Sequence, residues 1–254
     1  MVTIREIYGY LCELAPPELQ MSFDNAGFLV GRADAPVTGV LLALDITDEV
    51  IDEAAEKRCE LIVSHHPLIF HKLRSVTDQG PDARVLHLLE KGIGAICMHT
   101  NLDIAEGGVN DVLLSLLGAA CEGSLDAAGC GRFGLLPEPM PMPAFLAQVK
   151  SRLHAKGLRY YDAGKPVRRL AVMGGAGGDS LSDAWEKGCD TYVTADLKYH
   201  QFQDAAMMGL NLIDADHFFT ENPVIPVLCG KLNARFPELL CRVSERHGAL
   251  ISFF

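Results

Sequence analysis

The sequence has little that would place the protein in a membrane, in an oxidising compartment or on a nucleic acid. No apolar run approaches the roughly 20 residues that a membrane-spanning helix needs, and the first residues lack the pattern of a signal peptide. None of the eight cysteines forms a Cys-x-x-Cys pair, so we expect reduced core thiols rather than disulfides. With 33 acidic against 22 basic residues, the net charge of −11 argues against binding to a phosphate backbone. We therefore predict a cytoplasmic protein without membrane or nucleic-acid partners.

The chain has enough length and apolar content to bury a substantial core. Of its 254 residues, 49% are hydrophobic, which suffices for one large domain or two small ones. Short apolar runs, for example residues 40–44 and 61–63, alternate with segments of helical spacing, as is typical of an α/β protein. Glycine and proline are frequent in residues 122–143, which indicates a crossover. We therefore expect a first α/β half in residues 1–121 and a second in residues 144–254.

Two adjacent histidines, His65 and His66, directly follow the apolar run 61–63. In open α/β sheets ligands bind outside the carboxyl ends of the strands, so two imidazoles there can converge on one ligand or metal. A second polar segment, from His99 to Asp103, follows another predicted strand. A lone histidine is more often a hydrogen-bonded core residue, whereas an adjacent pair at a strand end favours a ligand role. Asp103 is equally compatible with capping the helix that follows it.

The strand and helix unit around the histidine pair occurs twice in the chain. A shift of 130 positions lays residues 54–60 on residues 184–190, and a shift of about 117 lays the strand that ends at His99 on the one that ends near His217. The order of elements agrees as well as the residues, which favours an internal duplication. Two such halves would face each other and share one cleft. The side chains expected there are His65, His66, His99, Asp103, Asp196, His200, His217 and Glu221.

Imidazoles and carboxylates in one place indicate a transition-metal site. Together they suit Zn, Fe, Mn, Co or Ni, whereas oxygen ligands alone would favour Mg or Ca. Four or five such groups exceed the needs of one tetrahedral ion, which favours two ions bridged by a carboxylate. Two ions can lower the pKa of a bound water towards about 7 and clamp an oxyanion, as in metal-dependent hydrolases. A protein that stores, delivers or senses metal, or that uses metal as a scaffold, would need the same ligands.

Some of these residues have a simpler interpretation. Asp196 and His200 could close a loop by hydrogen bonds, and His217 with Glu221 is a weak pattern by itself. The glycine-rich stretch 173–180 also admits a dinucleotide-binding turn with Asp196 on the ribose. Ser180 stands where that fingerprint needs its third glycine, so a nicotinamide cofactor is disfavoured.

Taken together, these motifs resemble those of the NIF-three-like family, whose members are often named GTP cyclohydrolase I type 2 homologs. The resemblance extends from Phe23 to Pro223, and its motifs at residues 64–70 and 99–103 are specific. It implies two similar α/β halves of the NIF-three-like fold, with a dinuclear metal site in the cleft between them. It also implies two divalent metal ions per chain and five ligands, with Asp103 as the bridge: His65, His66, Asp103, His217 and Glu221.

The resemblance carries further expectations about chemistry and assembly. His99 would support the metal ligands without binding the ion itself, or act as a catalytic acid or base. Arg132 matches a family loop near the cleft. The substrate would be small and nucleotide-like or cyclic, hydrolysed in a reaction similar to that of a cyclohydrolase, unless the protein only stores, delivers or senses metal. The compact bacterial members form a toroidal homohexamer with the metal sites facing its inner cavity.

The sequence departs from the family pattern at three positions. Phe23 stands where the family usually has Trp, and Ala195 where it usually has Gly; both indicate changes in packing. Asp216 replaces a glycine that commonly precedes the ligand histidine. Its carboxylate could alter the metal preference of His217 or orient the imidazole ring.

Overall fold

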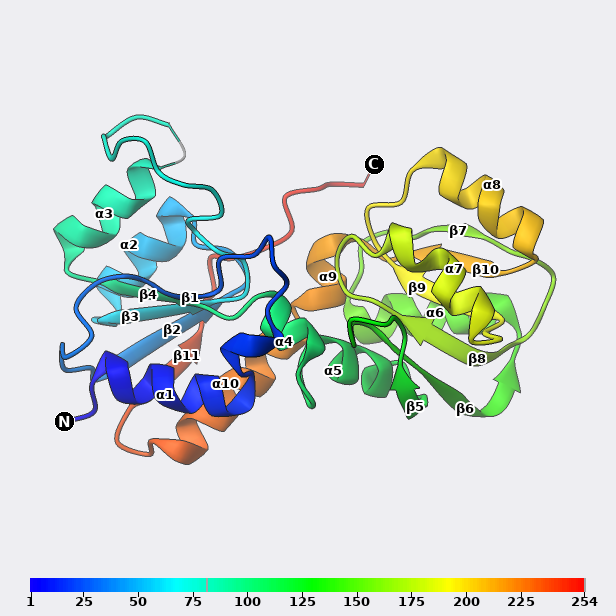
Figure 1. The fold of residues 1–254 in the computed structure, drawn as a ribbon, viewed down its shortest axis with the longest axis horizontal. Helices are drawn as coiled ribbons and strands as arrows, with labels where there is room; N and C mark the ends of the chain where they lie inside the picture. The colour runs from blue at the N-terminus through cyan, green and yellow to red at the C-terminus, as the bar shows by residue number, and fades with distance from the viewer. Residues whose placement is uncertain (81, 254) are drawn as a thin grey trace. The chain divides into compact units, whose positions relative to one another are not determined.

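Two mixed β-sheets, one in each of two compact units, organise the chain (Figure 1). The computed structural model describes residues 1–80 and 82–253. Unit 1 comprises residues 1–106 and 225–248, and unit 2 comprises residues 107–224 and 249–254. The α/β class is as predicted from the sequence. The units differ from the predicted halves because the chain returns to unit 1 for its last strand.

The sheet of unit 1 has the strand order β1-β4-β3-β2-β11. The strands β4, β3, β2 and β11 are parallel neighbours, whereas β1 pairs antiparallel with β4. Every residue of β2, β3 and β4 is buried, as expected for parallel strands covered on both faces. The strands of this sheet are β1 (Gly27–Val30), β2 (Gly39–Ala43), β3 (Leu61–Ser64), β4 (Gly94–Cys97) and β11 (Leu240–Val243).

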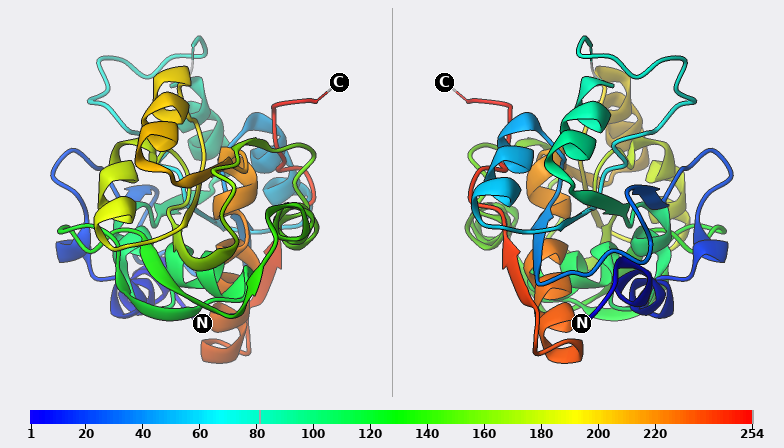
Figure 2. Two further views of the ribbon diagram at one scale, coloured as in Figure 1. Left: turned by 90° about the vertical axis from the view of Figure 1, so that its right-hand side faces the viewer. Right: turned by 90° about the vertical axis from the view of Figure 1, so that its left-hand side faces the viewer.

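Helices cover both faces of this sheet (Figures 1 and 2). On one face α2 and α3 pack against Leu41 and Ile62, and on the other lie α1 and α10. The capping box of Thr3 and Glu6 begins α1, and Gly92, at φ 69°, ends α3 in a left-handed cap. The helices of unit 1 are α1 (Ile4–Leu14), the 3₁₀ turn η1 (Pro17–Leu19), α2 (Asp48–Glu56), α3 (Ala83–Lys91), α4 (Thr100–Ile104) and α10 (Val224–Arg235), whose first residue belongs to unit 2.

The sheet of unit 2 has the strand order β5-β6-β8-β9-β10-β7, with β8, β9 and β10 parallel. On one face α5 and α6 pack against Val193 and Ile213; α7 and α8 lie on the other (Figure 2). The strands are β5 (Ala120–Ser124), β6 (Arg132–Met140), β7 (Arg159–Tyr161), β8 (Val167–Val172), β9 (Thr191–Thr194) and β10 (Asn211–Asp214). The helices are α5 (Val109–Leu116), α6 (Met142–Leu153), the 3₁₀ turn η2 (Gly178–Ser180), α7 (Leu181–Glu186), α8 (Tyr199–Met208) and α9 (His217–Glu221).

The two sheets contain the same run of elements at constant spacing. In unit 1, Val40 pairs with Leu61, the first residue of β3. In unit 2, the residues 130 positions later form the same pair, Leu170 with Thr191, the first residue of β9. The first of the two sequence shifts therefore relates equivalent places in the two sheets. The second shift relates the starts of β4 and β10 and those of α4 and α9. The similarity also includes α1 with α6 and β1 with β7, which the sequence comparison missed. The difference between the shifts corresponds to a longer loop after β3 in unit 1, and this loop begins with His65.

The segment 122–143, predicted as a crossover, instead contributes to β5 and β6, which form an antiparallel pair. Its glycines permit close approach of the two strands, since a Cβ on Gly134 would lie 2.0 Å from the carbonyl oxygen of Ala120. Pro137 and Pro139 are exposed and lie where the pairing of β6 with β8 shifts register. Such positions tolerate a residue without an N–H. The turn-forming composition of the segment therefore reflects strand packing rather than a linker.

The sequence predicts reduced cysteines in the core and no membrane-spanning helix. All eight cysteines are free, and six of them are buried. In the described part of the chain, no helix has the length and apolar content that crossing a membrane requires.

A buried carboxylate joins α2 to the segment that follows β11. Glu53, whose side chain is 1% exposed, accepts hydrogen bonds from the hydroxyl of Ser244, the backbone N–H groups of Glu245 and Arg246, and the ammonium group of Lys57. Burial by itself raises the pKa of Glu53, but these hydrogen bonds outweigh it and lower the pKa from 4.5 to about 2.

Replacing Glu53 with Gln should lower the free energy of unfolding by about 2 kcal/mol near neutral pH, because hydrogen bonds to a charged group are lost. Since the folded pKa lies below the unfolded one, this stabilisation is complete above pH 4.5 and is lost as the pH falls towards about 2. Urea unfolding should therefore show a smaller difference between Glu53→Gln and wild type near pH 3 than near neutral pH. Glu49→Gln, an exposed position of the same helix, is the control. Equal stability of Glu53→Gln and wild type near neutral pH would contradict this prediction.

Candidate functional site

Three imidazoles gather where β3 and β4 of unit 1 end. His65 and His66 follow β3, and His99 follows β4 by two residues. Because these strands are parallel and pair in register, their carboxyl ends lie at the same edge of the sheet. One ring nitrogen of each histidine lies within 4.8 Å of the others. The structure thus brings together the histidines that the sequence places at two separate strand ends.

Asp103 lies beside these histidines on the short helix α4. Its Oδ1 is 3.6 Å from Nε2 of His65. The alternative role of helix cap does not apply, because α5 begins after Gly108 and has no side-chain cap. The carboxylate therefore belongs to the histidine cluster of unit 1.

Each histidine of this cluster is oriented by a hydrogen bond at Nδ1. The partners are a carbonyl oxygen or a carboxylate, which accept hydrogen bonds and cannot donate them, so Nδ1 carries the proton. In its neutral form each ring then presents the lone pair of Nε2, as is usual for histidines that bind metal. The three pairs are His65 with the carbonyl of Met98 at 2.8 Å, His66 with Asp45 at 2.7 Å, and His99 with Asp24 at 2.8 Å.

Asp24 is the most strongly held of these acceptors. Its side chain is fully buried, and its carboxylate also accepts hydrogen bonds from the backbone N–H and the hydroxyl of Thr100. Burial alone raises the pKa of Asp24, but the hydrogen bonds from His99 and Thr100 lower it to about 2. Sequence reasoning gave Asp24 and Asp45 no role in orienting the rings, because they lie 75 and 21 positions from their histidines.

A second set of ligand-type residues lies in unit 2. His217 and Glu221 are the first and last residues of α9, one turn apart, with Nε2 of His217 3.0 Å from Oε2 of Glu221. The Nδ1 of His217 donates to Asp196 at 2.7 Å. Asp196 occupies the position in unit 2 that is equivalent to His66, so the second unit has a ring-orienting carboxylate where the first has an imidazole.

The absence of a side chain at Gly175 leaves space for His217 and Glu221. It adopts a left-handed φ of 64°, and a Cβ there would lie 2.2 Å from Oε1 of Glu221 and 3.1 Å from Nε2 of His217. Gly177, two residues later, also has no space for a side chain, since a Cβ there would lie 2.4 Å from the hydroxyl of Thr194. The glycines of this stretch therefore permit close packing around α9. No role in binding a pyrophosphate is needed to explain them.

Three further residues considered from the sequence, His200, Arg132 and Asp216, do not belong to either set of candidate metal ligands. His200 is exposed on the first turn of α8, and among the described residues no hydrogen bond or ion pair involves it. Arg132 is buried, pairs with Asp111 at 2.7 Å and donates to the carbonyl groups of its own loop. Asp216 caps α9 through the N–H of Phe218, whereas Asp196 orients the ring of His217.

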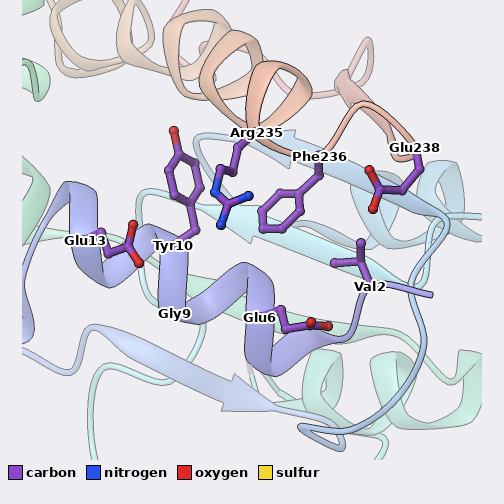
Figure 3. Close-up of a pocket in the computed structure, with 8 residues that line it drawn as sticks. All are labelled: Val2, Glu6, Gly9, Tyr10, Glu13, Arg235, Phe236 and Glu238. Carbon is purple, nitrogen blue, oxygen red and sulfur yellow. The ribbon is translucent and has the colours of Figure 1, made fainter.

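A groove of about 470 Å³ between α1 and α10 is a further concave surface of unit 1 (Figure 3). Arg235 lies over the rings of Tyr10 and Phe236, at 5.8 and 5.2 Å from their centroids. The acidic residues around it are Glu6, Glu13 and Glu238. The groove contains no imidazole, and its aromatic faces are already covered by a guanidinium, so it does not resemble the histidine cluster.

The donor atoms of both sets fit divalent transition metals. Neutral imidazoles held at Nδ1, with carboxylates beside them, are the ligands that Zn, Fe, Mn, Co and Ni accept. The left-handed glycine next to Glu221 leaves space at the carboxylate that a side chain would fill. The number and identity of the ions, the meeting of both sets in one cleft and the hexameric assembly stay predictions.

Comparison with known proteins gives matches along nearly the whole chain. A profile of the family described as Duf34/NIF3 (NGG1p interacting factor 3) matches residues 2–247. A Clostridium perfringens protein named GTP cyclohydrolase 1 type 2 homolog is 36% identical over 240 residues, 91% of this chain and 92% of that protein. The crystal structure of the Staphylococcus aureus protein SA1388 matches with a TM-score of 0.91 and 28% identity over 100% of this chain and 99% of the other. A Bacillus cereus protein related to NIF3 gives a TM-score of 0.89 and 25% identity over the same shares.

Replacing Gly175 with Ala should lower the affinity for divalent metal about tenfold or more, because the new methyl group would displace Glu221. Gly188→Ala is the matched control, since Gly188 has a similar φ of 70° but open space around its Cβ. Both variants carry the strain of a left-handed alanine, roughly 1 kcal/mol, and Gly175→Ala must in addition move Glu221, so its thermal stability should fall at least as far as that of Gly188→Ala. Isothermal titration calorimetry with Zn²⁺ or Mn²⁺ measures the metal affinity of each variant and so distinguishes them. Equal metal affinity in the two variants would contradict the role given to Gly175.

Proposed function

The chain belongs to the Duf34/NIF3 family, and from its oriented histidines and carboxylates we propose that it is a metal-dependent hydrolase. Its substrate in this proposal is small and nucleotide-like or cyclic. The observation that carries the proposal is the hydrogen bond at Nδ1 of His65, His66 and His217, which leaves Nε2 of each ring as a ligand atom. A core histidine also forms hydrogen bonds, but the rings of His65, His66 and His99 in addition bring one nitrogen each within 4.8 Å of the others.

The proposed ligands are His65, His66 and Asp103 of unit 1 and His217 and Glu221 of unit 2. We propose two divalent ions per chain, with Asp103 as the bridging ligand. Bound ions of this kind supply an acidified water and stabilise a developing oxyanion. The partial exposure of the His66 and His217 side chains, 24% and 33%, supports a catalytic site, because substrate and water need open positions.

His99 is proposed as the acid or base of the reaction rather than as a ligand. The carboxylate of Asp24 holds the proton on Nδ1, so that Nε2 can accept and return a proton. Asp24 is a positioning residue here, because it acts on substrate through the ring of His99. The relatives named GTP cyclohydrolase 1 type 2 homolog support a reaction on a nucleotide, although that name describes those proteins.

Metal storage, delivery or sensing is the second candidate function. It is favoured by the burial of two proposed ligands, since the side chains of His65 and Glu221 are 0% and 6% exposed. A closed set of ligands suits retention of metal, whereas catalysis needs an open position. The two functions predict the same metal content and differ in turnover.

Elemental analysis of protein purified without chelator should find about two divalent ions per chain after metal supplementation. His65→Ala and Glu221→Ala should each lower this content to about one or fewer, because each removes a ligand. His87→Ala is the control, since His87 pairs with Asp48 and Asp52 on the surface of unit 1. Full metal content in both ligand variants, or no metal in the wild type, would contradict the proposed metal centre.

His99→Gln should keep the metal content of the wild type and lower kcat about 100-fold or more on any substrate that the wild type hydrolyses, because acid–base catalysis contributes roughly 10²–10⁴-fold. Asp24→Asn should retain metal and show a smaller loss of kcat with a changed pH profile. A panel of nucleotides and cyclic amidines provides the assay. Stable metal binding by the wild type without turnover of any of these compounds would favour the second candidate function.

A further inference from the structure

Two phenylalanine rings are exposed beside His99 in unit 1. Phe23 is 62% exposed and Phe70 is 41% exposed, although rings of this size are normally buried. Their centroids are 6.4 Å apart, and that of Phe70 is 6.2 Å from the ring of His99. Together they form an aromatic surface that leads from solvent to the histidine cluster. Adjacent exposed aromatic side chains at the rim of a polar site are typical of ligand-binding surfaces.

The loops that carry the two rings are tied to each other and to the cluster. The side-chain amide of Asn25 donates to the carbonyl of Ile69 at 2.5 Å, which joins the loop of Phe23 to the loop of Phe70. Asp24, next to Phe23 in the chain, holds Nδ1 of His99. The position of the aromatic surface is therefore coupled to the orientation of His99. Phe70 lies in the loop after β3, which is longer than its counterpart after β9 in unit 2.

The loop after β3 carries two basic side chains near Phe70 in the sequence. Its residues 67–77 contain Lys72 and Arg74, and Asp78 and Asp82 follow before α3 begins. Both basic side chains are exposed. Lys72 and Arg74 lie within four positions of Phe70 in the chain, and an ammonium and a guanidinium complement an anionic group such as phosphate.

The geometry points to a stacking platform, formed by Phe23 and Phe70, that binds the planar heteroaromatic ring of an anionic ligand such as a nucleotide. The inference rests on the proposed function in naming this ligand a substrate, whereas ring binding is measurable without turnover. A ring stacked on Phe70 lies next to His99, so its reactive atoms are delivered to the proposed acid or base. The faces of phenylalanine rings stack on heteroaromatic rings with little dependence on base identity.

Equilibrium titration with the four ribonucleoside 5′-monophosphates tests the platform, with ribose 5-phosphate as the probe that lacks a ring. Phe70→Ala should weaken nucleotide binding roughly 5- to 100-fold, the range that alanine substitution gives for base stacking, and leave ribose 5-phosphate unchanged. Phe70→Trp should retain or tighten nucleotide binding, because indole also stacks. Tyr199→Ala, which removes a ring 79% exposed on unit 2, is the matched control and should bind as the wild type does.

A fluorescence reporter gives a second measurement. The chain has a single tryptophan, Trp185, so Phe23→Trp in a Trp185→Phe background places the only indole in the proposed platform. Nucleotide should quench its emission, and ribose 5-phosphate should not. The titrations are repeated after removal of metal by chelation. Binding that survives chelation and depends on Phe70 supports the platform even if elemental analysis contradicts the metal centre.

Two results would overturn the inference. One is unchanged nucleotide affinity in folded Phe23→Ala and Phe70→Ala proteins, with circular dichroism as the check on folding. The other is a change in the mass of the assembly in these variants without any change in nucleotide affinity. That result would assign the exposed rings to contact with a second copy of the chain.

Discussion

The proposed chemistry of this protein depends on one kind of interaction, the hydrogen bond from Nδ1 of a histidine to a fixed acceptor. Without it each ring could rotate and exchange tautomers, and no nitrogen would point consistently at a ligand. The acceptors at His66, His99 and His217 are carboxylates, which favour the proton on Nδ1 electrostatically as well as geometrically. The backbone carbonyl at His65 serves the same purpose where the ring is fully buried.

The repeated unit shows how one backbone arrangement carries two different sets of side chains. At equivalent positions after β3 and β9, unit 1 has His66 and unit 2 has Asp196. The helices α4 and α9 are likewise equivalent, yet one begins with Thr100 and the other with His217. Parallel strands bring their carboxyl ends to one edge in both units, so the position suited to a ligand is retained while the proposed ligand residue moves by one loop.

Buried carboxylates serve two separate purposes in this chain. Glu53 binds N–H groups of the segment after β11 and so fastens the end of the chain to α2. Asp24 accepts hydrogen bonds from Thr100 and His99 and so fixes the orientation of the His99 ring. Hydrogen bonds lower the pKa of both groups to about 2, which keeps them charged where burial alone would favour the neutral acid. The longer loop after β3 adds the aromatic surface of Phe70 beside the second of these networks.

The sequence by itself determined the α/β class, the cap of α1, the stop of α3 at Gly92 and the strand ends that carry His65, His66 and His99. These features depend on local patterns: apolar runs, capping residues and a glycine that tolerates a positive φ. The tertiary structure alone decided that the segment 122–143 contributes to β5 and β6, that Asp24 orients His99, and that Gly175 leaves space for Glu221. Such relations depend on sheet pairing and loop packing between residues far apart in the chain, for which a single sequence has no spacing signal.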